Sequence, residues 1–469
     1  MSETIGVRNP RTGIIDYWIT PPSPQKIAET CQNLRQAQKD WQQTEVEQKI
    51  ATLQQWKQAL LSHKTALINT LAVDTSRLSE SRLEFDAVIS SLDRWCRWVP
   101  QLLSVPHENS NISFVQLQYQ LVPYSLVGII SPWNSPLLLS LIDTIPALLA
   151  GCAVIIKPSE IAPRFIQPLM QTIQTVPQLN QILTYIVGDG NTGKQLIDRV
   201  DLVCFTGGVS TGKKVAEAAA KRFIPAFLEL GGKDPAIVLE SANLDLATSA
   251  LLWGSVVNTG HACLSIERIY VAESIFTPFV DQLVQKAKNL SLTYPDIETG
   301  EIGPIIAERQ AKIIREHLQD AVDKGAIICC GGTVENLGGG YWCRPTVLTQ
   351  VNHSMKVMTE ETFGPIMPVM AVSSPAEAIQ LANETEYGLS AAVFAGSDTE
   401  AIAIAHQINA GGISINDAGL TGLIHQGEKN SFKSSGLGGS RMGKASLRRF
   451  FRKKLMLVKT EEKPNPWWY

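Results

Sequence analysis

One cysteine lies in a sequence context that suits nucleophilic chemistry. Cys263 ends the segment NTGHAC (258–263), whose polar residues and glycine predict a loop, and we expect a helical segment after it. A thiolate on an accessible loop can attack a carbonyl carbon. A lone cysteine is more often a packing residue, so this context alone leaves a structural role open. His261 is two residues away, a spacing that does not by itself establish contact with the thiol.

A glutamate in apolar company is the second candidate. Glu229 stands between two leucines in LELGGK (228–233), where a strand is predicted to end. Desolvation raises the pKa of a carboxyl group and makes it a usable general base near neutral pH. A buried salt bridge with Lys233 explains the same pattern equally well.

An asparagine in a stiff turn is the third candidate. Asn134 lies within PWNSP (132–136), where two prolines restrict the backbone between a predicted strand and a predicted helix. A preorganised amide donor of this kind suits an oxyanion site and is worth about 3–4 kcal/mol in a transition state. Capping of the following helix by the asparagine or the serine is the alternative.

Two glycine-rich turns could approach a phosphate group. Gly188, Gly190 and Gly193 form a GxGxxG pattern, but the acidic residue that usually follows the next strand is absent. This leaves open whether the turn touches a cofactor, and argues against it as the main phosphate clamp. FTGGVSTG (205–212) is better placed, because it follows a predicted strand and opens a helix whose first N–H groups would be free. A plain strand-to-helix turn is the alternative there.

The segment EETFGP (360–365) combines paired acids with an aromatic residue. One acid could hold a ribose, and Phe363 could pack on a planar ring. A solvated turn is the alternative.

These candidates are separated by short apolar runs that alternate with helix-length segments. Fully apolar strands in such an alternation predict a parallel, doubly wound sheet, in which ligands bind at the carboxyl ends of the strands. The first set of predicted strands is 124–131, 152–157, 184–187, 201–205 and 226–230. A second α/β domain is predicted from strands at 268–271, 326–330, 366–371, 391–395 and 412–416, with helices near 273–289, 305–323, 376–385 and 398–408.

The region before the first sheet, residues 24–104, is predicted to be helical. Leu53, Trp56 and Leu60 recur at i, i+3 and i+7, with Gln and Lys on the other faces.

The composition is that of a folded globular protein. The chain has 469 residues, of which 44% are hydrophobic and 18% charged, and this excludes a disordered or fibrous protein. A net charge of −3 gives no support for nucleic acid as a partner.

Eight cysteines are scattered without a CxxC pair, and no His and Cys fall at zinc-binding spacing, so no metal site is predicted. We expect a reduced, cytoplasmic protein. The first residues lack a basic segment followed by an apolar one, so secretion is not expected. The uncharged stretch 109–142 exceeds the roughly 20 residues of a membrane span, but its prolines favour strand, turn and helix.

Seven motifs in one order resemble the aldehyde dehydrogenase superfamily, whose members are NAD(P)-dependent and, in this pattern, hydrolytic. Chance agreement of all seven is negligible, and Glu229 and Cys263 lie 34 positions apart, as in the family. The motifs are PWNSP, IIKPSE, FTGGVSTG, LELGGKDP, NTGHACLS, EETFGP and KSSGLGG.

The resemblance implies a role for each candidate residue. Cys263 corresponds to the nucleophile, Glu229 to the general base, and Asn134, with the backbone N–H of Cys263, to the oxyanion hole. Relatives that pass the acyl group to coenzyme A generally lack the glutamate, so Glu229 favours hydrolysis. A coenzyme A-dependent acylating enzyme of the same fold and a catalytically silent relative remain as alternatives.

The expected cofactor is NAD, with NADP possible. Lys157 and Glu160 correspond to the residues that hold the adenosine ribose, and a carboxylate at Glu160 accepts from a free 2′-hydroxyl but repels a 2′-phosphate. By the resemblance and the glycine patterns, the expected cofactor contacts are Trp133, Lys157, Glu160, Gly190, Gly207, Gly208, Gly212, Glu361 and Phe363.

The family also implies the domain organisation. The boundaries are 1–104 and 124–230 for a Rossmann-type NAD-binding domain, 231–445 for the catalytic domain, and 105–123 with 446–469 for a β-hairpin oligomerisation element. The alternating segment SFVQLQYQLVPY (113–124) agrees with an exposed ribbon that needs a partner strand, so a homodimer or homotetramer is expected. A membrane-surface patch at RRFFRKK (448–454) is the less favoured alternative.

Five departures from the family pattern are visible. Gly208 stands where relatives often have serine, His261 replaces a common glutamine, Asp234 a common asparagine or serine, and Asp143 a lysine found in many aldehyde oxidisers. The C-terminal signature reads GLGGSRMG rather than GxGRxxG.

The residues expected around the aldehyde are apolar. They are Leu138, Leu139, Ile142, Ala262, Leu264 and residues 420–424. No arginine among them could grip a second carboxylate, so the prediction is a hydrophobic aldehyde, aliphatic or aromatic, in preference to succinic semialdehyde or an amino aldehyde.

Overall fold

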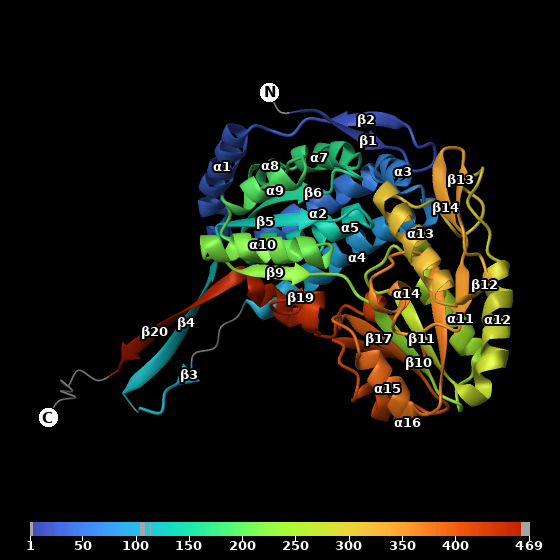
Figure 1. Cartoon of the computed structure of the whole chain (residues 1–469). Coiled ribbons are helices and arrows are strands. Elements are labelled where there is room, and N and C mark those ends of the chain that lie inside the picture. Colours follow the sequence, from blue (N-terminus) through green and yellow to red (C-terminus); the bar gives the residue numbers. More distant parts are fainter. Residues whose placement is uncertain (1–2, 104–107, 113, 461–469) are drawn as a thin grey trace.

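The computed structural model describes residues 3–103, 108–112 and 114–460. Figure 1 shows two α/β domains side by side and a two-stranded ribbon that projects from one of them. Among the described residues, no helix is both long enough and apolar enough to cross a membrane.

The segment after residue 23 is helical, as predicted, but is broken into four helices. Leu53, Trp56 and Leu60 are fully buried, which confirms the helical spacing. The helices are α1 (Pro24–Gln43), α2 (Val46–Ser62), α3 (Lys64–Thr75) and α4 (Leu78–Leu102). Ser76, with φ at 57°, makes the turn that separates α3 from α4.

The first sheet has the order β19-β9-β8-β5-β6-β7. The five strands that the sequence predicts for it are confirmed. They are β5 (Leu126–Ser131), β6 (Ala153–Pro158), β7 (Leu183–Tyr185), β8 (Leu202–Thr206) and β9 (Ala226–Glu229), all parallel, with the short β19 (Gly436–Leu437) antiparallel to β9. The chain runs from β5 outward to β7 and then returns to β8 on the other side. The crevice between the ends of β5 and β8 is therefore the switch point at which ligands bind in such sheets.

Helices connect these strands and cover the sheet (Figure 1). They are α5 (Pro136–Leu141), α6 (Thr144–Ala150), α7 (Ile166–Gln174), α8 (Pro177–Ile182), α9 (Gly190–Ile197) and α10 (Val209–Arg222). Every residue of β5 and β6 is buried, which explains their unbroken apolar sequences.

The second sheet has the order β12-β15-β16-β11-β10-β17-β18. The predicted strands appear as β11 (Ile266–Ala272), β12 (Ile327–Cys330), β16 (Ile366–Val372), β17 (Ser390–Phe394) and β18 (Gly412–Ile415). β10 (Asp234–Val238) and β15 (Thr346–Thr349) were not anticipated, and β12 is an antiparallel edge strand. The main helices are α11 (Leu244–Val256), α12 (Phe276–Lys288), α13 (Glu308–Asp323), α15 (Pro375–Asn383) and α16 (Asp398–Ala405).

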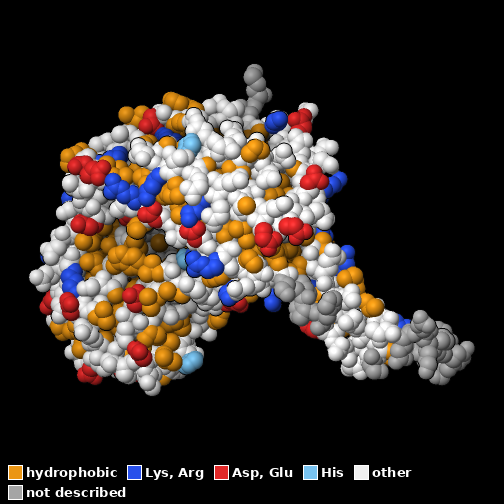
Figure 2. Space-filling model, turned by 180° about the vertical axis from the view of Figure 1, so that it is seen from behind, with side chains coloured by type: hydrophobic (Ala, Val, Ile, Leu, Met, Phe, Trp, Pro, Cys, Tyr) orange, Lys and Arg blue, Asp and Glu red, His pale blue; other side chains and the backbone are white. Residues whose placement is uncertain are grey.

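The projecting ribbon consists of β4 (Val115–Pro123) and β20 (Phe451–Lys459), which pair antiparallel along their whole length. The short β3 (Glu108–Asn109) pairs with the outer part of β4. Figure 2 shows the ribbon at the lower right, away from the body of the molecule. The predicted element thus forms a ribbon, while residues 104–107, 113 and 461–469 lie outside the described part of the chain.

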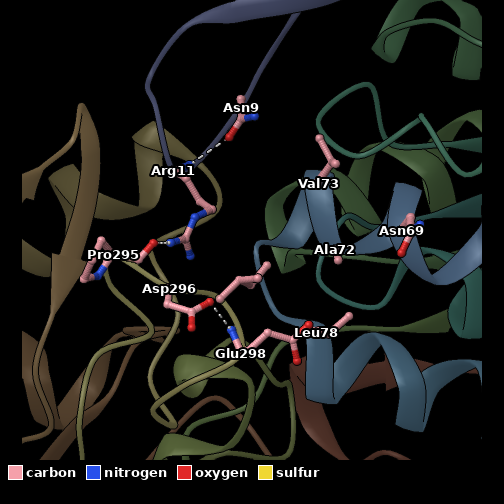
Figure 3. Close-up of a pocket in the computed structure, with 10 residues that line it drawn as sticks. Asn9, Arg11, Asn69, Ala72, Val73, Leu78, Pro295, Asp296 and Glu298 are labelled. Carbon is pink, nitrogen blue, oxygen red and sulfur yellow. Dashed lines mark hydrogen bonds between the residues drawn. The ribbon is translucent and has the colours of Figure 1, made fainter.

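An N-terminal hairpin of β1 (Ile5–Arg8) and β2 (Ile15–Ile19) was not anticipated. Arg8 donates to the Gly339 carbonyl at 3.1 Å, in the turn between β13 (Val334–Leu337) and β14 (Gly340–Cys343). A cavity of about 470 Å³ lies between the hairpin turn, α3 and the loop at 295–298 (Figure 3). None of the predicted site residues lines it, so the candidate chemistry lies elsewhere.

Candidate active site

The loop that carries Cys263 has an unusual backbone. Asn258, Thr259 and Gly260 take positive φ angles of 56°, 56° and 72° in succession. Non-glycine residues in this region cost of order 1 kcal/mol or more each, so surrounding contacts must hold them there. Cys263 itself precedes β11 rather than a helix, and the expectation of a helical segment after it was wrong. In the second domain the candidate residues thus lie before the strands, at their amino ends.

Arg77 supplies the contacts that hold this loop. Its buried guanidinium, at the start of α4, donates to Thr259 Oγ1 at 3.1 Å, to His261 Nδ1 at 2.7 Å and to Asn258 Oδ1. It also donates to the Pro304 carbonyl at 3.2 Å. One arginine therefore holds the side chains of Asn258 and Thr259, whose backbones are left-handed, and that of His261. These contacts fix the loop that carries the thiol.

Cys263 is half-buried, and burial raises the pKa of its thiol to about 12. The Lys429 ammonium opposes this shift, while Asp234, Glu361 and Glu229 add to it. The thiol is therefore protonated at neutral pH in this arrangement and must lose its proton before it can attack. A Cβ on Gly232 would lie 2.7 Å from the Cys263 carbonyl oxygen, so the segment that follows Glu229 packs against the cysteine loop.

The main chain of Glu229 is fixed on both sides at the end of β9. Its carbonyl accepts from the Gly207 N–H at 3.2 Å, and Gly436 of β19 is its antiparallel partner. Its half-buried side chain accepts one hydrogen bond, from Ser431 Oγ to Oε2 at 2.8 Å. The alternative of a salt bridge with Lys233 is wrong, because the buried Lys233 ammonium lies 2.6 Å from Glu267.

The paired glycines after Glu229 allow the site to close. A Cβ on Gly231 would lie 2.4 Å from Glu361 Oε2, and one on Gly232 would lie 2.7 Å from the Cys263 carbonyl oxygen. Only residues without a side chain let these segments approach so closely. The Gly232 N–H also donates to Glu361 Oε1 at 3.1 Å, although burial still raises the pKa of that carboxyl to about 8.

Asn134 contacts the cysteine loop instead of capping a helix. Its Nδ2 donates to the His261 carbonyl at 2.9 Å, and its own carbonyl accepts from Asn258 Nδ2 at 2.9 Å. Ser135, at the N-cap of α5, makes no side-chain capping bond either, so the capping alternative was wrong. Within the described residues, the Asn134 amide makes this one donor contact, which leaves its second N–H without a protein acceptor.

The rings of Trp133, His261 and Phe363 pack together beside Asn134 and the cysteine loop, with Trp133 in edge-to-face contact with the other two. The Trp133 ring centroid lies 5.2 Å from that of His261 and 5.5 Å from that of Phe363. Arg77 donates to Nδ1 of His261, so the proton of the neutral ring is on Nε2, which is buried without a partner among the described residues. Burial and the nearby arginine hold the pKa of His261 well below its usual range, so the ring is neutral.

The two glycine-rich turns differ at their helix N-termini. Asp189 caps α9 by accepting from the Asn191 and Thr192 N–H groups at 3.0 and 3.2 Å, which places a carboxylate where a phosphate would sit. Gly208, at the N-cap of α10, offers no side-chain cap and faces open space. The α10 turn therefore fits an anion and the α9 turn, with the exposed Gly190, does not.

The remaining predicted cofactor residues surround this crevice. Lys157, near the end of β6, forms an ion pair at 3.2 Å with Glu160, which follows the strand. Gly212 lies in the first turn of α10, and a Cβ on it would lie 2.5 Å from the Leu230 side chain, so α10 packs closely against that residue. An uncapped helix N-terminus, an open glycine and a half-exposed carboxylate are the donor and acceptor set that a dinucleotide requires, so these residues fit that group.

The predicted substrate residues follow Asn134 along α5 and follow Cys263 in the cysteine loop. Leu138, Leu139 and Ile142 are half-buried, whereas Leu137 and Leu141 on the opposite face of α5 are core residues. Leu264 is also half-buried, and its Cδ1 would lie 3.4 Å from a Cβ on Gly422. Gly422 belongs to α17 (Leu420–Leu423), which was expected to line the aldehyde.

Among the described residues, no group of three or more His, Cys, Asp or Glu side chains is arranged to hold a metal ion. All eight cysteines are free.

Comparison with known proteins identifies this arrangement. Residues 1–456 match the family model described as the aldehyde dehydrogenase family. The chain belongs to the aldehyde dehydrogenase family. It is therefore an enzyme of aldehyde oxidation.

The named relatives differ in substrate. The chain is 35% identical to 4,4'-diapolycopene aldehyde oxidase of Methylomonas sp, over 91% of this chain and 82% of that protein. It is 33% identical to a protein of Mycolicibacterium smegmatis provisionally named succinate-semialdehyde dehydrogenase [NADP(+)], over 83% of this chain and 76% of that protein.

Solved structures extend the likeness to the whole chain. The protein PutA of Anabaena variabilis, provisionally named an aldehyde dehydrogenase, is 63% identical with a TM-score of 0.98 and full coverage of both chains. Betaine aldehyde dehydrogenase of Staphylococcus aureus, in complex with NAD+, is 29% identical with a TM-score of 0.92, over 99% of this chain and 94% of that one.

In this aldehyde dehydrogenase, one departure from the family pattern has a structural explanation. Asp143 is fully buried and accepts from Arg441 at 2.8 Å and from Arg449 at 2.5 Å. Arg441 belongs to the altered C-terminal signature and also donates to Thr206 Oγ1. The acid at 143 and the altered signature thus compensate each other. Burial alone would raise the pKa of the Asp143 carboxyl, but the two arginines hold that pKa below its usual value.

Sequence reasoning missed several residues of the aldehyde dehydrogenase site. Arg77 and Ser431 contact the cysteine loop and Glu229, yet neither belongs to a motif with a chemical signature. Glu84 accepts from the Leu138 N–H at 2.8 Å and so holds the helix after Asn134. Arg77 lies inside the region 24–104 that was predicted to be helical, and the break between α3 and α4 that exposes its role appears only in the structure.

Proposed function

We propose that this enzyme oxidises an aldehyde to the carboxylic acid with NAD, through a thiohemiacetal and a thioester on Cys263. The observation that carries the proposal is the packing of the segment after Glu229 against Cys263, where a Cβ on Gly232 would lie 2.7 Å from the Cys263 carbonyl oxygen. The Glu229 carboxylate also adds to the raised pKa of the thiol. The amide of Asn134, tied to the same loop through the His261 carbonyl, completes the set.

Each step assigns a task to one of these groups. Because burial keeps the Cys263 thiol protonated, the thiol gives its proton to water before the sulfur attacks the carbonyl carbon. The free N–H of Asn134 and the backbone N–H of Cys263 stabilise the alkoxide that forms. After hydride has left the carbon, Glu229 removes a proton from water, and the hydroxide cleaves the thioester to release the acid.

Bound NAD+ would supply the hydride acceptor, so that aldehyde, NAD+ and water give acid, NADH and a proton. The α10 N-terminus would hold the pyrophosphate, Glu160 with Lys157 the adenosine ribose, and Glu361 with Phe363 the nicotinamide riboside. Trp133 packs on Phe363 and supports it. The carboxylate at Glu160 favours NAD, and NADP is the secondary cofactor.

We propose a hydrophobic aldehyde as the substrate. Leu138, Leu139, Ile142 and Leu264 line the approach, and Leu420, Leu423 and Ile424 are exposed beside it, with 63% of Leu423 accessible. An apolar approach favours an aliphatic or aromatic aldehyde because burial of each CH₂ contributes about 0.8 kcal/mol. The likeness to a carotenoid aldehyde oxidase agrees with this choice, whereas the likeness to a succinate-semialdehyde dehydrogenase does not.

The test is kcat/KM for NADH formation with hexanal, decanal, benzaldehyde and succinic semialdehyde, each with and without coenzyme A. The proposal predicts the highest value for one of the first three and a free acid as the product. A clear preference for succinic semialdehyde would overturn the substrate class. Acyl-coenzyme A as the product would favour the acylating alternative, and the absence of NADH with every aldehyde would favour a silent relative.

We further propose that the ribbon of β4 and β20 pairs with another copy of the chain, giving a homodimer or homotetramer. Leu455, Met456 and Leu457 are exposed along β20, and an uncovered apolar edge of this length favours association. Light scattering of the full chain checks the assembly. The eight free cysteines support a reducing, cytoplasmic location.

A further inference from the structure

The Glu229 carboxylate receives a single side-chain hydrogen bond, and its donor is a serine remote in sequence. Ser431 Oγ donates to Oε2 at 2.8 Å. Among the described residues, Glu229 forms no ion pair. The hydroxyl is therefore the contact that fixes the position of the carboxylate, while Oε1 has no hydrogen-bond partner among the described residues and can accept a proton.

The segment around Ser431 is anchored on both sides. The Phe432 N–H donates to the Gly388 carbonyl at 2.9 Å, and the Ser434 N–H donates to the Glu386 carbonyl at 2.9 Å. The Leu230 N–H donates to the Ser435 carbonyl at 2.9 Å, which ties the same segment to the residue after Glu229. Ser431 is thus held in a fixed place relative to the β9 backbone.

A glycine makes room for this contact. Gly436 lies opposite Glu229 on β19, and a Cβ there would be 2.6 Å from the Ser431 Cβ. Its φ of 174° is ordinary extended backbone, so the requirement for glycine is spatial. The strand pairing and the missing side chain together bring the hydroxyl over the carboxylate.

The charged and titratable groups near Glu229 do not replace the serine. The Cys263 thiol and the Arg441 guanidinium interact with Glu229 electrostatically. Arg441 directs its donor NH2 to Asp143 and Thr206. Neither group makes a hydrogen bond to Glu229 in the described part of the chain.

We propose that Ser431 is a positioning residue for the general base, which holds the Glu229 carboxylate oriented for hydrolysis of the thioester. This inference rests on the proposed function, in which Glu229 activates the water. A hydroxyl that donates to a carboxylate restricts the rotation of the side chain. Loss of the hydroxyl should therefore slow deacylation and leave formation of the thioester nearly unchanged.

The experiment compares Ser431→Ala, Ser431→Thr and the matched control Ser434→Ala with wild type, using hexanal and NAD+ in stopped flow. A hydrogen bond to a charged group is worth roughly tenfold or more in rate. We expect the kcat of Ser431→Ala to fall about tenfold, with a burst of about one NADH per subunit. Ser431→Thr should restore kcat to within about threefold, and Ser434→Ala should match wild type.

A cofactor-independent readout separates a defect in deacylation from one in folding. Hydrolysis of p-nitrophenyl acetate on Cys263 should show a fast release of p-nitrophenol in Ser431→Ala, as in wild type, followed by a slower steady rate. An active wild type and a Ser431→Ala variant with the same kcat and burst would overturn this inference alone. A wild type that forms no NADH with any aldehyde would instead overturn the proposed function.

Discussion

Two glutamates near the site, Glu229 and Glu267, have opposite surroundings. Glu267 is buried, and its oxygens accept from the Lys233 ammonium at 2.6 Å and from the Thr362 and Phe363 N–H groups, each at 2.7 Å. Glu229 is half-buried and accepts from one hydroxyl. Three donors occupy most of the lone-pair sites of Glu267 and fix both of its oxygens, so Glu267 positions the segment at Phe363. Glu229, whose carboxylate accepts a single hydrogen bond among the described residues, is the acid that can accept a proton from water.

The largest expected effect concerns the partner of Glu229. Cys263→Ala should reduce kcat by at least about 10⁴-fold, because no other side chain can form the thioester. Cys330→Ala is the control, since that half-buried thiol packs beside β15 and should leave kcat unchanged.

Adding Glu229→Gln to Cys263→Ala should cost nothing further, because residues that act as a unit are not additive. Steady-state rates of the single and double variants measure this. A further large loss in the double variant would mean that Glu229 acts independently of the thiol.

The next effect concerns Glu267. Lys233→Met removes its cation and leaves a buried carboxylate unpaired, which should lower the free energy of unfolding by about 3–5 kcal/mol. Urea denaturation measures this loss. The matched variant Ser431→Ala should change the unfolding free energy by about 1 kcal/mol or less. Equal losses in the two variants would remove the distinction between a structural and a chemical acid.

Asn134→Ala should lower kcat about 10²-fold with little change in KM for NAD+, because the amide acts on the alkoxide. Asn258→Ala would sharpen the comparison, since Asn258 also binds the His261 carbonyl but supports the loop. We expect its main effect on thermal stability. Loss of kcat only in Asn258→Ala would contradict the assignment of the oxyanion hole.

A third carboxylate, Glu84, gives the smallest expected effect. It is buried with only backbone donors, and burial raises its pKa to about 8. The folded state therefore holds this proton more tightly than the unfolded state, whose pKa is near 4.3. The stabilising contribution is full below that value and is lost as the pH rises through about 8. Glu84→Gln should thus gain stability relative to wild type between pH 5 and 9, as measured by thermal unfolding; a constant difference would be contradictory.

Local patterns were sufficient to predict the strands and the reactive segments. The apolar runs of β5 and β6 are buried on both faces, so their sequences alone indicate a parallel sheet. β10 was missed because Pro235 interrupts a run of only five residues. The break between α3 and α4 depends on Ser76 in a left-handed conformation, which serine rarely adopts and no pattern predicts.

The contacts that tune the site could not be predicted from the sequence. Ser431 reaches Glu229 across 202 positions, and Arg77 reaches the cysteine loop across 184 positions at His261. Such pairs exist only after the sheets have formed, because β19 and β9 must first align. The compensation of Asp143 by Arg441 is of the same kind: the sequence showed both departures, but not that they meet.

The most direct test of the central claim is a rapid-mixing experiment on Glu229→Gln with NAD+ and an excess of hexanal. If Glu229 is the base for hydrolysis, NADH should rise in a burst of about one equivalent per subunit and then nearly stop, with the acyl group retained on Cys263 in the intact mass. Steady turnover of Glu229→Gln at the wild-type rate, with no acylated protein, would contradict the account.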